Sequence, residues 1–425
     1  MKLKQRRLVN RQYLMLALGL FSSITVLQVA SISLFLLIIY CYLFYIIFFN
    51  KNFIVINSPF LPFLIAATVS ACLSTYLNLS DGYVVNNLKG LLNFFAVFLT
   101  SSTLISQINA KEFAALLTGL QWSCRIQVLW IILQTIFWTL WEFDINQFIF
   151  ADLLHMVDKA SQFKGTGYVP TGLCWNAGGI APILFFGFFL EKRLVFKIFV
   201  ITGALLTQSA TLTVGIILCG IINLLLSLRN TQKKFKFGNK KSIFVSLFII
   251  LLFGLCLYLF SANIVQQFTR LWEVFSYRLA GLMDTNSTLD SSTSAHLGYF
   301  VNLPSVLAAG SIVTFLLGYG VNCSGFPYSA VVGQYAGETW IVECDITNII
   351  LNFGIIGFIF FYIWIIDGIC KLHGKRSYIV WPIVVIAIMG VTYNLQYIWV
   401  IFIELLIFSS KERRMLNTIS ASFIA

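Results

Sequence analysis

Charged residues are scarce in this chain of 425 residues, because Asp, Glu, Lys and Arg together make up 10% of it. Soluble domains carry about 25% charged residues, so this scarcity argues against a soluble globular protein. The hydrophobic content of 59% and the mean hydropathy of +0.88 predict instead an all-α polytopic membrane protein. The chain shows neither an internal repeat nor a low-complexity tract, so residues 1–425 are expected to form a single membrane domain.

Several chemical motifs are also missing. The chain has three His and nine Cys residues but neither a CxxC pair nor the Cys/His spacing of a zinc site, so no metal centre is predicted. A Walker loop and a GxGxxG turn after a strand are absent as well, which argues against nucleotide chemistry on the cytoplasmic face. We therefore expect no cofactor and no nucleic-acid partner.

Long apolar runs are what the chain has in abundance. A transmembrane helix needs roughly 20 apolar residues, and about twelve such runs are present. They are centred on Leu14–Val29, Ser33–Phe49, Pro59–Leu77, Leu91–Ile108, Leu117–Trp141, Gly178–Leu190, Leu194–Gln208, Leu212–Leu228, Ile243–Ser261, Ile346–Ile366, Tyr378–Tyr393 and Tyr397–Phe408.

Basic residues fall in alternate connections between these runs. Alternating spans place the basic N-terminus, Lys111, Lys192–Arg193 and residues 233–241 on one side. Because cytoplasmic loops are enriched in Lys and Arg, both termini are predicted to be cytoplasmic. Residues 142–175 and 263–345 then form a first and a long extracytoplasmic loop. The net charge of +12 is explained by this orientation signal and by contact with the lipid bilayer.

The long loop contains two arginines, Arg270 and Arg278, in a predicted amphipathic helix. Their spacing places them within about 80° of each other around the helix axis. The planar guanidinium fork matches phosphate oxygens, so both are candidates for binding a lipid pyrophosphate. The alternative is that both side chains extend to lipid headgroups without a catalytic role.

A histidine and two acids complete the candidate chemistry of this loop. His296 follows a Ser/Thr-rich turn and is a candidate phosphate donor or general base near neutral pH. Glu343 and Asp345 lie at the entry to the tenth apolar run, where a carboxylate can take a proton from a sugar hydroxyl. The alternatives are a passive surface role for His296 and helix capping by Asp345.

Arg125 differs from these candidates because it lies inside an apolar run. An ionisable residue within a span is costly to bury, which makes it a functional candidate by default. If the span is shifted, Arg125 instead anchors the membrane interface. Two interpretations are open for Cys323 and Cys344: they form a disulfide in the long loop, or they remain thiols.

The order of several short motifs resembles that of the O-antigen polymerase (Wzy) family, to which the O-antigen ligases are related. The motifs run from Gly165 towards the C-terminus. They are Gly165–Asn176 before a span, Thr207–Ser209 at an external turn, the long loop with Arg278 and His296, Leu317–Gly320, and Glu343-x-Asp345 before Gly354–Gly357.

Three features of this pattern distinguish the chain within that group. Ala210 stands where relatives often have Arg, and His296 also stands where many have Arg. Ligases typically carry a His just before the Gly-Ile-Ile-Gly span, whereas here Glu343 and Asp345 stand in that region. The resemblance therefore favours a polymerase over a ligase.

The resemblance implies a metal-independent glycosyltransferase with a GT-C-like fold in a bacterial inner membrane. It would join undecaprenyl-pyrophosphate-linked oligosaccharides, which serve as donor and acceptor, on the periplasmic side. A chain-length regulator is an additional expected partner. The implied catalytic residues are Glu343, Asp345 and His296, the pyrophosphate contacts are Arg278, Arg270 and Arg125, and the sugar contacts are Lys164, Asn176 and Tyr319.

Two alternative functions remain open from the sequence. An O-antigen ligase is the alternative within the same group, and a lipid-linked oligosaccharide flippase or another transporter is the alternative from a different class. Transporters often show internal repeats and polar residues at mid-membrane. This chain instead collects its polar residues in one long external loop.

Overall fold

The computed structural model describes the protein in a series of segments, and the chain is mostly helical in them, as the sequence predicts. The described residues are 2–29, 32–49, 61–77, 81–106, 109–157, 160, 162–164, 167–174, 177–207, 209–230, 298–333, 342, 344–371, 381–382 and 384–386.

The helices are named in chain order. They are α1 (Lys2–Phe21), α2 (Leu34–Phe49), α3 (Leu61–Leu77), α4 (Asp81–Ser106), α5 (Ala110–Trp141), α6 (Ala177–Leu190), α7 (Leu194–Leu206), α8 (Ala210–Asn230), α12 (Leu303–Ala309), α13 (Ile312–Leu317), α14 (Gly325–Val332) and α15 (Asp345–Lys371), together with a π-helical segment, η1 (Gln147–Leu153).

Two antiparallel hairpins of short strands accompany the helices. In the first, β1 (Gln28–Val29) pairs with β2 (Ile32–Ser33) between α1 and α2. In the second, β3 (Gln162–Lys164) pairs with β4 (Gly167–Val169) in the segment that follows α5. Both hairpins connect helices and neither forms a layer of its own.

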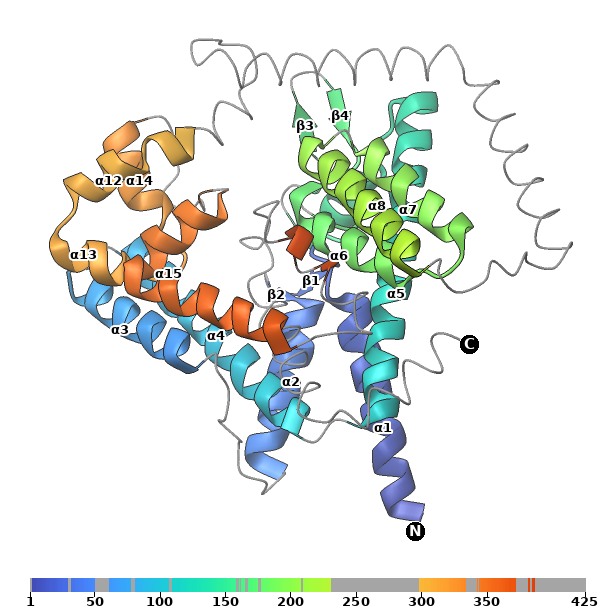
Figure 1. Ribbon diagram of the computed structural model, residues 1–425, viewed down its shortest axis with the longest axis horizontal. Coiled ribbons are helices and arrows are strands. Elements are labelled where there is room, and N and C mark those ends of the chain that lie inside the picture. Colours follow the sequence, from blue (N-terminus) through green and yellow to red (C-terminus); the bar gives the residue numbers. More distant parts are fainter. Residues whose placement is uncertain are drawn as a thin grey trace, which may run out of the picture.

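The helices form two groups, which Figure 1 shows side by side. One group contains α3, α4, α13 and α15, with α12 and α14 beyond them, and the other contains α5, α6, α7 and α8. Helix α1 packs against α5 and α2 packs against α4, and α1 and α2 also contact each other. The first two helices therefore link the two groups.

Two of the described helices are long and apolar enough to cross a membrane. They span Lys111–Trp141 in α5 and Asp345–Ile366 in α15. Helix α5 begins at a capping box, in which the Asn109 side chain accepts the amide of Glu112 and the Glu112 side chain accepts the amide of Asn109. Such reciprocal bonds satisfy amides that the first helical turn leaves unpaired.

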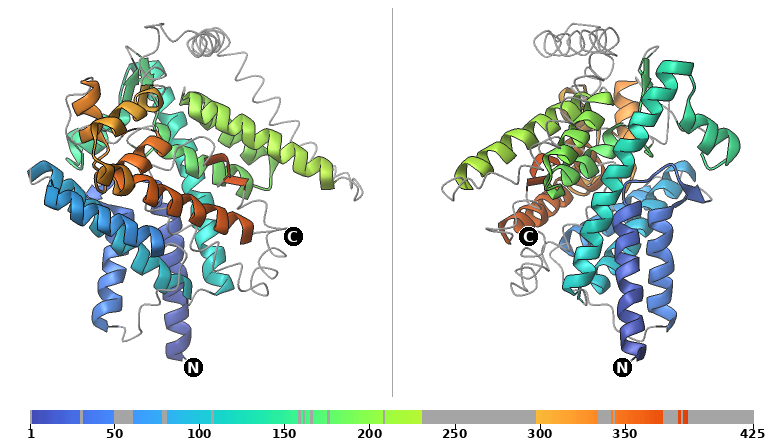
Figure 2. Two further views of the ribbon diagram at one scale, coloured as in Figure 1. Left: turned by 60° about the vertical axis from the view of Figure 1, so that its left-hand side comes forward. Right: turned by 90° about the vertical axis from the view of Figure 1, so that its right-hand side faces the viewer.

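Helices α1 and α5 run parallel and touch along much of α1, as Figure 2 shows. Gly19 faces Gly119, and the hydroxyls of Ser23 and Ser123 lie 2.7 Å apart beyond the end of α1. A Cβ on Gly19 would lie 2.4 Å from a carbonyl oxygen of α5. Glycine is therefore required where the two backbones meet, as in other closely packed helix pairs.

Helix α15 lies antiparallel to α3. Phe63, near the start of α3, packs against Phe361 far along α15, with ring centroids 5.2 Å apart. The hydroxyl of Ser70, further along α3, donates to the carbonyl oxygen of Asn352 at 2.9 Å. These contacts hold α3 alongside α15 on both sides of residue 354.

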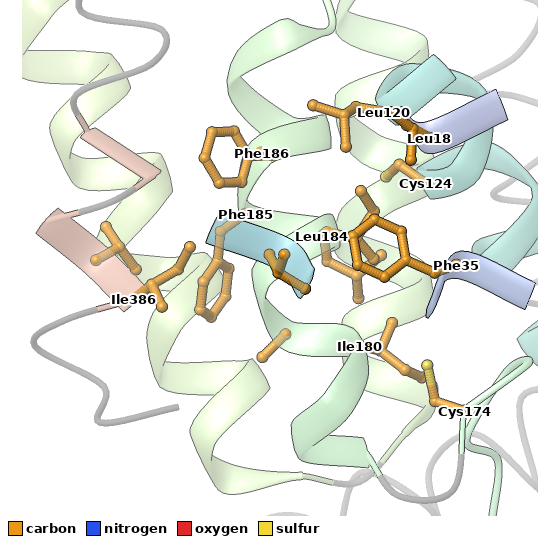
Figure 3. Close-up of a cluster of buried hydrophobic side chains, with 14 of the residues drawn as sticks. Leu18, Phe35, Leu120, Cys124, Cys174, Ile180, Leu184, Phe185, Phe186 and Ile386 are labelled. Atoms are coloured by element: carbon orange, nitrogen blue, oxygen red, sulfur yellow. The ribbon is translucent and has the colours of Figure 1, made fainter. Parts of the chain in front are cut away.

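The largest hydrophobic core extends through both groups of helices, and one part of it lies where α1, α2, α5 and α6 meet. Figure 3 shows Leu18, Phe35, Cys124 and Leu184, one from each helix, in this core. Helix α6 approaches α5 closely at Gly187, where a Cβ would lie 2.1 Å from the sulfur of Cys124. This tight packing fixes α6 and its C-terminal end against α5.

The observed helices correct two predicted spans. The first span was expected to reach Val29, but α1 ends at Phe21, where the Ser22 hydroxyl bonds back to a carbonyl oxygen of α1 and a β-hairpin follows. The fourth span was expected to begin at Leu91, but α4 begins at Asp81. Its first turns are polar, so they form helix that a search for apolar runs does not detect.

The predicted long loop also contains regular structure. Within residues 298–333, three short helices, α12, α13 and α14, pack on one another and on α15. Glycine, proline and serine residues interrupt them, so hydropathy alone gives no sign of a helix in this region.

Candidate functional site

The site is built on a break in α15. Gly354 has a φ of 65° and a ψ of −175°, a conformation that is essentially restricted to glycine. The break divides α15 into a short arm, residues 345–353, and a long arm, residues 355–371. Asp345, a predicted catalytic residue, is the first residue of the short arm.

Polar residues line one face of the short arm. Asp345, Asn348 and Asn352 are three and four residues apart, which places them on the same side of a helix. Asp345 is 3% exposed, and both asparagines are fully buried. Buried polar groups require hydrogen-bond partners, so this face has to meet polar groups from elsewhere in the chain.

The segment that follows α13 supplies these partners. The Ser324 hydroxyl donates to Asn348 Oδ1 at 2.6 Å, and the same oxygen accepts from Asn352 Nδ2 at 3.0 Å. Asn352 Oδ1 in turn accepts the backbone amide of Cys323 at 2.9 Å. The short arm is thereby tied to residues 323–324 through a continuous chain of hydrogen bonds.

Two glycines allow the backbones to cross beside this network. A Cβ on Gly318 would lie 2.4 Å from the carbonyl oxygen of Asn352, and a Cβ on Gly354 would lie 2.3 Å from a carbonyl oxygen of α13. Both glycines have a positive φ. The Leu317–Gly320 and Gly354–Gly357 motifs, which are distant in the sequence, therefore meet at a direct backbone contact.

Tyr319, a predicted sugar contact, lies at this crossing. Its amide donates to the carbonyl oxygen of Leu351 at 2.7 Å, and its carbonyl oxygen accepts a hydrogen bond from the Ser74 hydroxyl on α3. Its ring packs against the cluster that contains Tyr299 and Tyr328. These contacts place Tyr319 beside the short arm, and its binding of sugar stays a prediction.

Asn87 on α4 fixes the same segment from the opposite side. Its Oδ1 accepts the amide of Val321 at 2.8 Å, and its Nδ2 donates to the carbonyl oxygen of Ala71 on α3 at 2.7 Å. The Gly320 backbone lies directly on this side chain, because a Cβ there would be 2.7 Å from Asn87 Oδ1. Helices α3, α4 and α15 thus hold the site from three directions.

The break also turns the long arm of α15 back towards Asp345. On a straight helix Asp345 and Tyr362 would be about 25 Å apart along the axis. In the structure, Phe358 of the long arm and Ile346 of the short arm pack against the same cluster, which contains Tyr299 and Tyr328. The break therefore brings the long arm back to the cluster that the start of the short arm contacts.

The segment after α5 is fastened to that helix by two glutamines. Gln134 Oε1 accepts the amide of Gly172 at 2.7 Å, and Gln127 Oε1 accepts the next amide, also at 2.7 Å. Asn146 Nδ2 donates to the Gly172 carbonyl oxygen at 2.8 Å. In the same segment, Lys164, a predicted sugar contact, lies on β3 with its backbone opposite Gly167.

Arg125 is paired with a carboxylate that the sequence analysis did not single out. Its Nε donates to Glu191 Oε1 at 2.6 Å and its Nη2 donates to Oε2 at 2.9 Å. Gln121 donates to the same carboxylate at 2.9 Å, and the guanidinium carbon lies 4.1 Å from the ring centroid of Phe196. This bidentate pair ties the end of α6 to α5, and pyrophosphate binding by Arg125 stays a prediction.

Replacing Arg125 by Ala is expected to destabilise the folded protein by about 2–5 kcal/mol, because Glu191 would keep a buried charge without its partner. Thermal unfolding of the purified protein measures this. The double variant Arg125→Ala, Glu191→Ala should recover part of the loss. A normal unfolding temperature with reduced activity would instead favour the predicted pyrophosphate contact.

Several predicted site residues lie outside the described residues. These are Glu343, His296, Arg270, Arg278 and Asn176, together with the predicted spans 243–261 and 397–408. In the part of the chain that the structure describes, no group of three or more His, Cys, Asp or Glu residues is arranged to hold a metal ion.

Cys323 and Cys344 are present as thiols, not as a disulfide. Burial raises the pKa of the Cys323 thiol to about 12. Only the thiolate reacts with maleimides, so a variant retaining Cys323 alone should resist labelling in the folded state between about pH 7 and 9 and react after unfolding. Mass spectrometry measures the labelled fraction. A disulfide would give a different result: in the unfolded wild-type protein, Cys323 would then be labelled only after a reductant is added.

The sequence analysis missed the asparagines of the short arm and the partner of Arg125. Asn348 and Asn352 lie in a run of isoleucine, leucine and phenylalanine, where their spacing of four residues was the available signal. Glu191 stands beside Lys192 and Arg193 and resembles an ordinary residue of a turn. Its pairing with α5 depends on a contact that local sequence does not reveal.

Comparison with known proteins gives no family for the chain, since no protein-family model matches it and no curated protein is similar enough to be a relative.

Proposed function

We propose that the protein polymerises lipid-linked oligosaccharide repeat units at the outer face of a bacterial inner membrane. The donor and acceptor would both be attached to undecaprenyl pyrophosphate, and the enzyme would be a metal-independent glycosyltransferase. Its membrane domain would contain about twelve spanning helices with a GT-C-like arrangement. A flippase or a ligase would share this setting, and the experiment below separates the three.

The helix directions support a chain that crosses a membrane repeatedly. If the spans alternate as the basic residues predict, the first and fifth spans point the same way and the third and tenth point in opposite ways. Helices α1 and α5 are parallel, and α3 and α15 are antiparallel. Both relations agree with the proposed alternation.

The single observation that carries the proposal is the buried carboxylate at the start of the broken helix α15. Asp345 is 3% exposed, begins α15, and shares a helical face with two buried asparagines. A carboxylate in such a place suits a general base, which removes a proton from an alcohol during group transfer. Helix capping explains Asp345 alone, but it does not explain the buried polar face that continues along the arm.

The proposed reaction needs no external source of energy. The acceptor hydroxyl gives its proton to Asp345 or Glu343 while its oxygen forms a bond to the anomeric carbon of the donor. The bond between that carbon and the phosphate oxygen breaks, and undecaprenyl pyrophosphate leaves with the electron pair. Arg278 and Arg270, with His296, would stabilise the charge that develops on the leaving group.

The test is reconstitution of the purified protein in liposomes with lipid-linked oligosaccharide isolated from cells that lack its gene. Polymerase activity predicts a ladder of longer products, and it should persist in EDTA because no metal takes part. Transfer of single units to a lipid A core would indicate a ligase. Movement of the lipid across the bilayer without longer products would indicate a flippase, and either result would overturn the proposal.

A further inference from the structure

The side-chain amide of Asn348 uses only one of its two polar atoms. Its Oδ1 accepts hydrogen bonds from Ser324 and Asn352, at 2.6 Å and 3.0 Å. Its Nδ2 is buried and has no hydrogen-bond partner. A buried donor without an acceptor lowers the stability of the folded state by about 1–3 kcal/mol, so an unpaired donor at this position indicates a group that binds there.

The orientation of this amide is fixed by its neighbours. The backbone amide of Cys323 can only donate, and it donates to Asn352, so the atom of Asn352 that it meets is Oδ1. Asn352 therefore presents its Nδ2 to Asn348, and the atom of Asn348 that accepts it is the oxygen. Exchanging the oxygen and nitrogen of Asn348 would set two NH2 groups against each other.

The unused donor belongs to the same helical face as Asp345. Residues three apart on a helix have Cβ atoms about 5–6 Å apart, and Asn348 lies one turn beyond Asp345. The oxygen and nitrogen of an amide point to different sides of its carbon, and the oxygen side of Asn348 is occupied by Ser324 and Asn352. The nitrogen is therefore directed away from that pair.

A group that contacts both Asp345 and the unused Asn348 donor has to donate a hydrogen bond to the first and accept one from the second. An ionised carboxylate only accepts hydrogen bonds, and an amide NH2 only donates them, whereas a hydroxyl does both. Such hydrogen bonds are about 2.7–2.9 Å long, and residues one helical turn apart have Cβ atoms about 5–6 Å apart, so one oxygen can bridge two side chains at this spacing. The chemistry therefore selects a hydroxyl, which either a sugar or a water molecule can supply.

We propose that Asn348 binds the reacting hydroxyl of the acceptor sugar and directs its O–H towards Asp345. This inference rests on the proposed glycosyl transfer and adds a substrate contact to it. One lone pair of the hydroxyl oxygen accepts from Asn348 Nδ2, and the other attacks the donor. The proton passes to Asp345, so the bonds formed and broken are those of the proposed reaction.

The substitution Asn348→Asp tests this contact because it keeps an acceptor oxygen for Ser324 and Asn352 but removes the donor. The control is Asn352→Asp, the same substitution one turn further from Asp345, which removes the donor to Asn348 Oδ1 and so reports the effect of disturbing the network itself. The probe is the repeat oligosaccharide cleaved from its lipid, which has no leaving group and can act only as acceptor.

We expect Asn348→Asp to raise the KM for this acceptor by about 10–100-fold, the effect of losing one buried hydrogen bond, with a smaller effect of Asn352→Asp. The KM for the lipid-linked donor should change equally in the two variants, and the unfolding temperature should fall further in Asn352→Asp, because that substitution also breaks the hydrogen bond from Asn352 to Asn348. An unchanged acceptor KM, or a loss of thermal stability alone, would assign the site to a structural water and overturn the inference.

Binding of the cleaved oligosaccharide, measured by native mass spectrometry, separates this inference from the proposed function. Binding by the wild type that is lost in Asn348→Asp, without any transfer activity, would support the hydroxyl site and reject the polymerase. Transfer activity of the wild type, together with equal binding of the cleaved oligosaccharide by the wild type and by Asn348→Asp, would support the polymerase and reject the hydroxyl site.

Discussion

Asp345→Asn is expected to reduce the rate of sugar transfer by about 10²–10⁴-fold, the usual effect of removing a general base. Asparagine keeps the size of the aspartate at this first residue of α15 and can still accept a hydrogen bond, so α15 should still begin at the same residue and the protein should still fold. The substitution thus separates the catalytic role from the capping role. Product formation from lipid-linked oligosaccharide in liposomes, with the protein amount normalised, measures the effect.

Asp152→Asn is the matched control for this experiment. Asp152 lies on η1 in the other predicted external loop, is exposed, and accepts a hydrogen bond from Gln147 at 3.2 Å. Its replacement should leave transfer within about twofold of the wild type, as surface substitutions usually do. Full activity of Asp345→Asn would remove Asp345 from the reaction and leave Glu343 and His296 as the remaining predicted bases.

Gly354→Ala is expected to destabilise the protein by about 3–5 kcal/mol and to abolish transfer, because two separate penalties combine. Its backbone conformation is nearly restricted to glycine, and the added Cβ would lie 2.3 Å from backbone atoms of α13. Straightening α15 relieves both penalties but moves Phe358 away from the cluster that the short arm contacts. Thermal unfolding and transfer assays of the purified variant measure the two effects.

Two other glycines serve as controls for backbone and steric effects. Gly333 has the same φ of 65°, but a Cβ added there would meet nothing within 4 Å, so Gly333→Ala should cost only about 1–2 kcal/mol. Gly220 lies in α8 with open space around it, and Gly220→Ala should stabilise that helix by up to about 1 kcal/mol. Equal effects at Gly333 and Gly354 would contradict the proposed backbone crossing.

Apolar runs in the sequence predict the position of a helix well where the whole helix is apolar. Helix α2 begins and ends within one residue of its predicted apolar run, whereas α5 ends with its run at Trp141 but begins seven residues earlier, at Ala110. The prediction fails for α4, whose first turns are polar. The break at Gly354 was also missed, because it depends on a contact with Gly318 that lies far away in the sequence.

The candidate site was predicted only in part, and the reason is again the range of the contacts. Asp345 was singled out because its position at the edge of an apolar run is visible locally. The hydrogen bonds of Asn348 to Ser324, and of Arg125 to Glu191, join residues from different elements. A single sequence shows that these polar residues interrupt apolar runs, but it does not show which of them become neighbours.

The parallel pairing of α1 with α5 has a consequence for how the protein is made. Ser23 meets a serine that is one hundred residues later in the chain, so the ribosome completes three further helices before the partner of α1 emerges. If the chain enters a membrane as proposed, the face of α1 that carries Gly19 is without α5 during that interval and contacts lipid or the insertion machinery. Nascent chains that stop before α5 should therefore be degraded quickly, while chains that include α5 should persist.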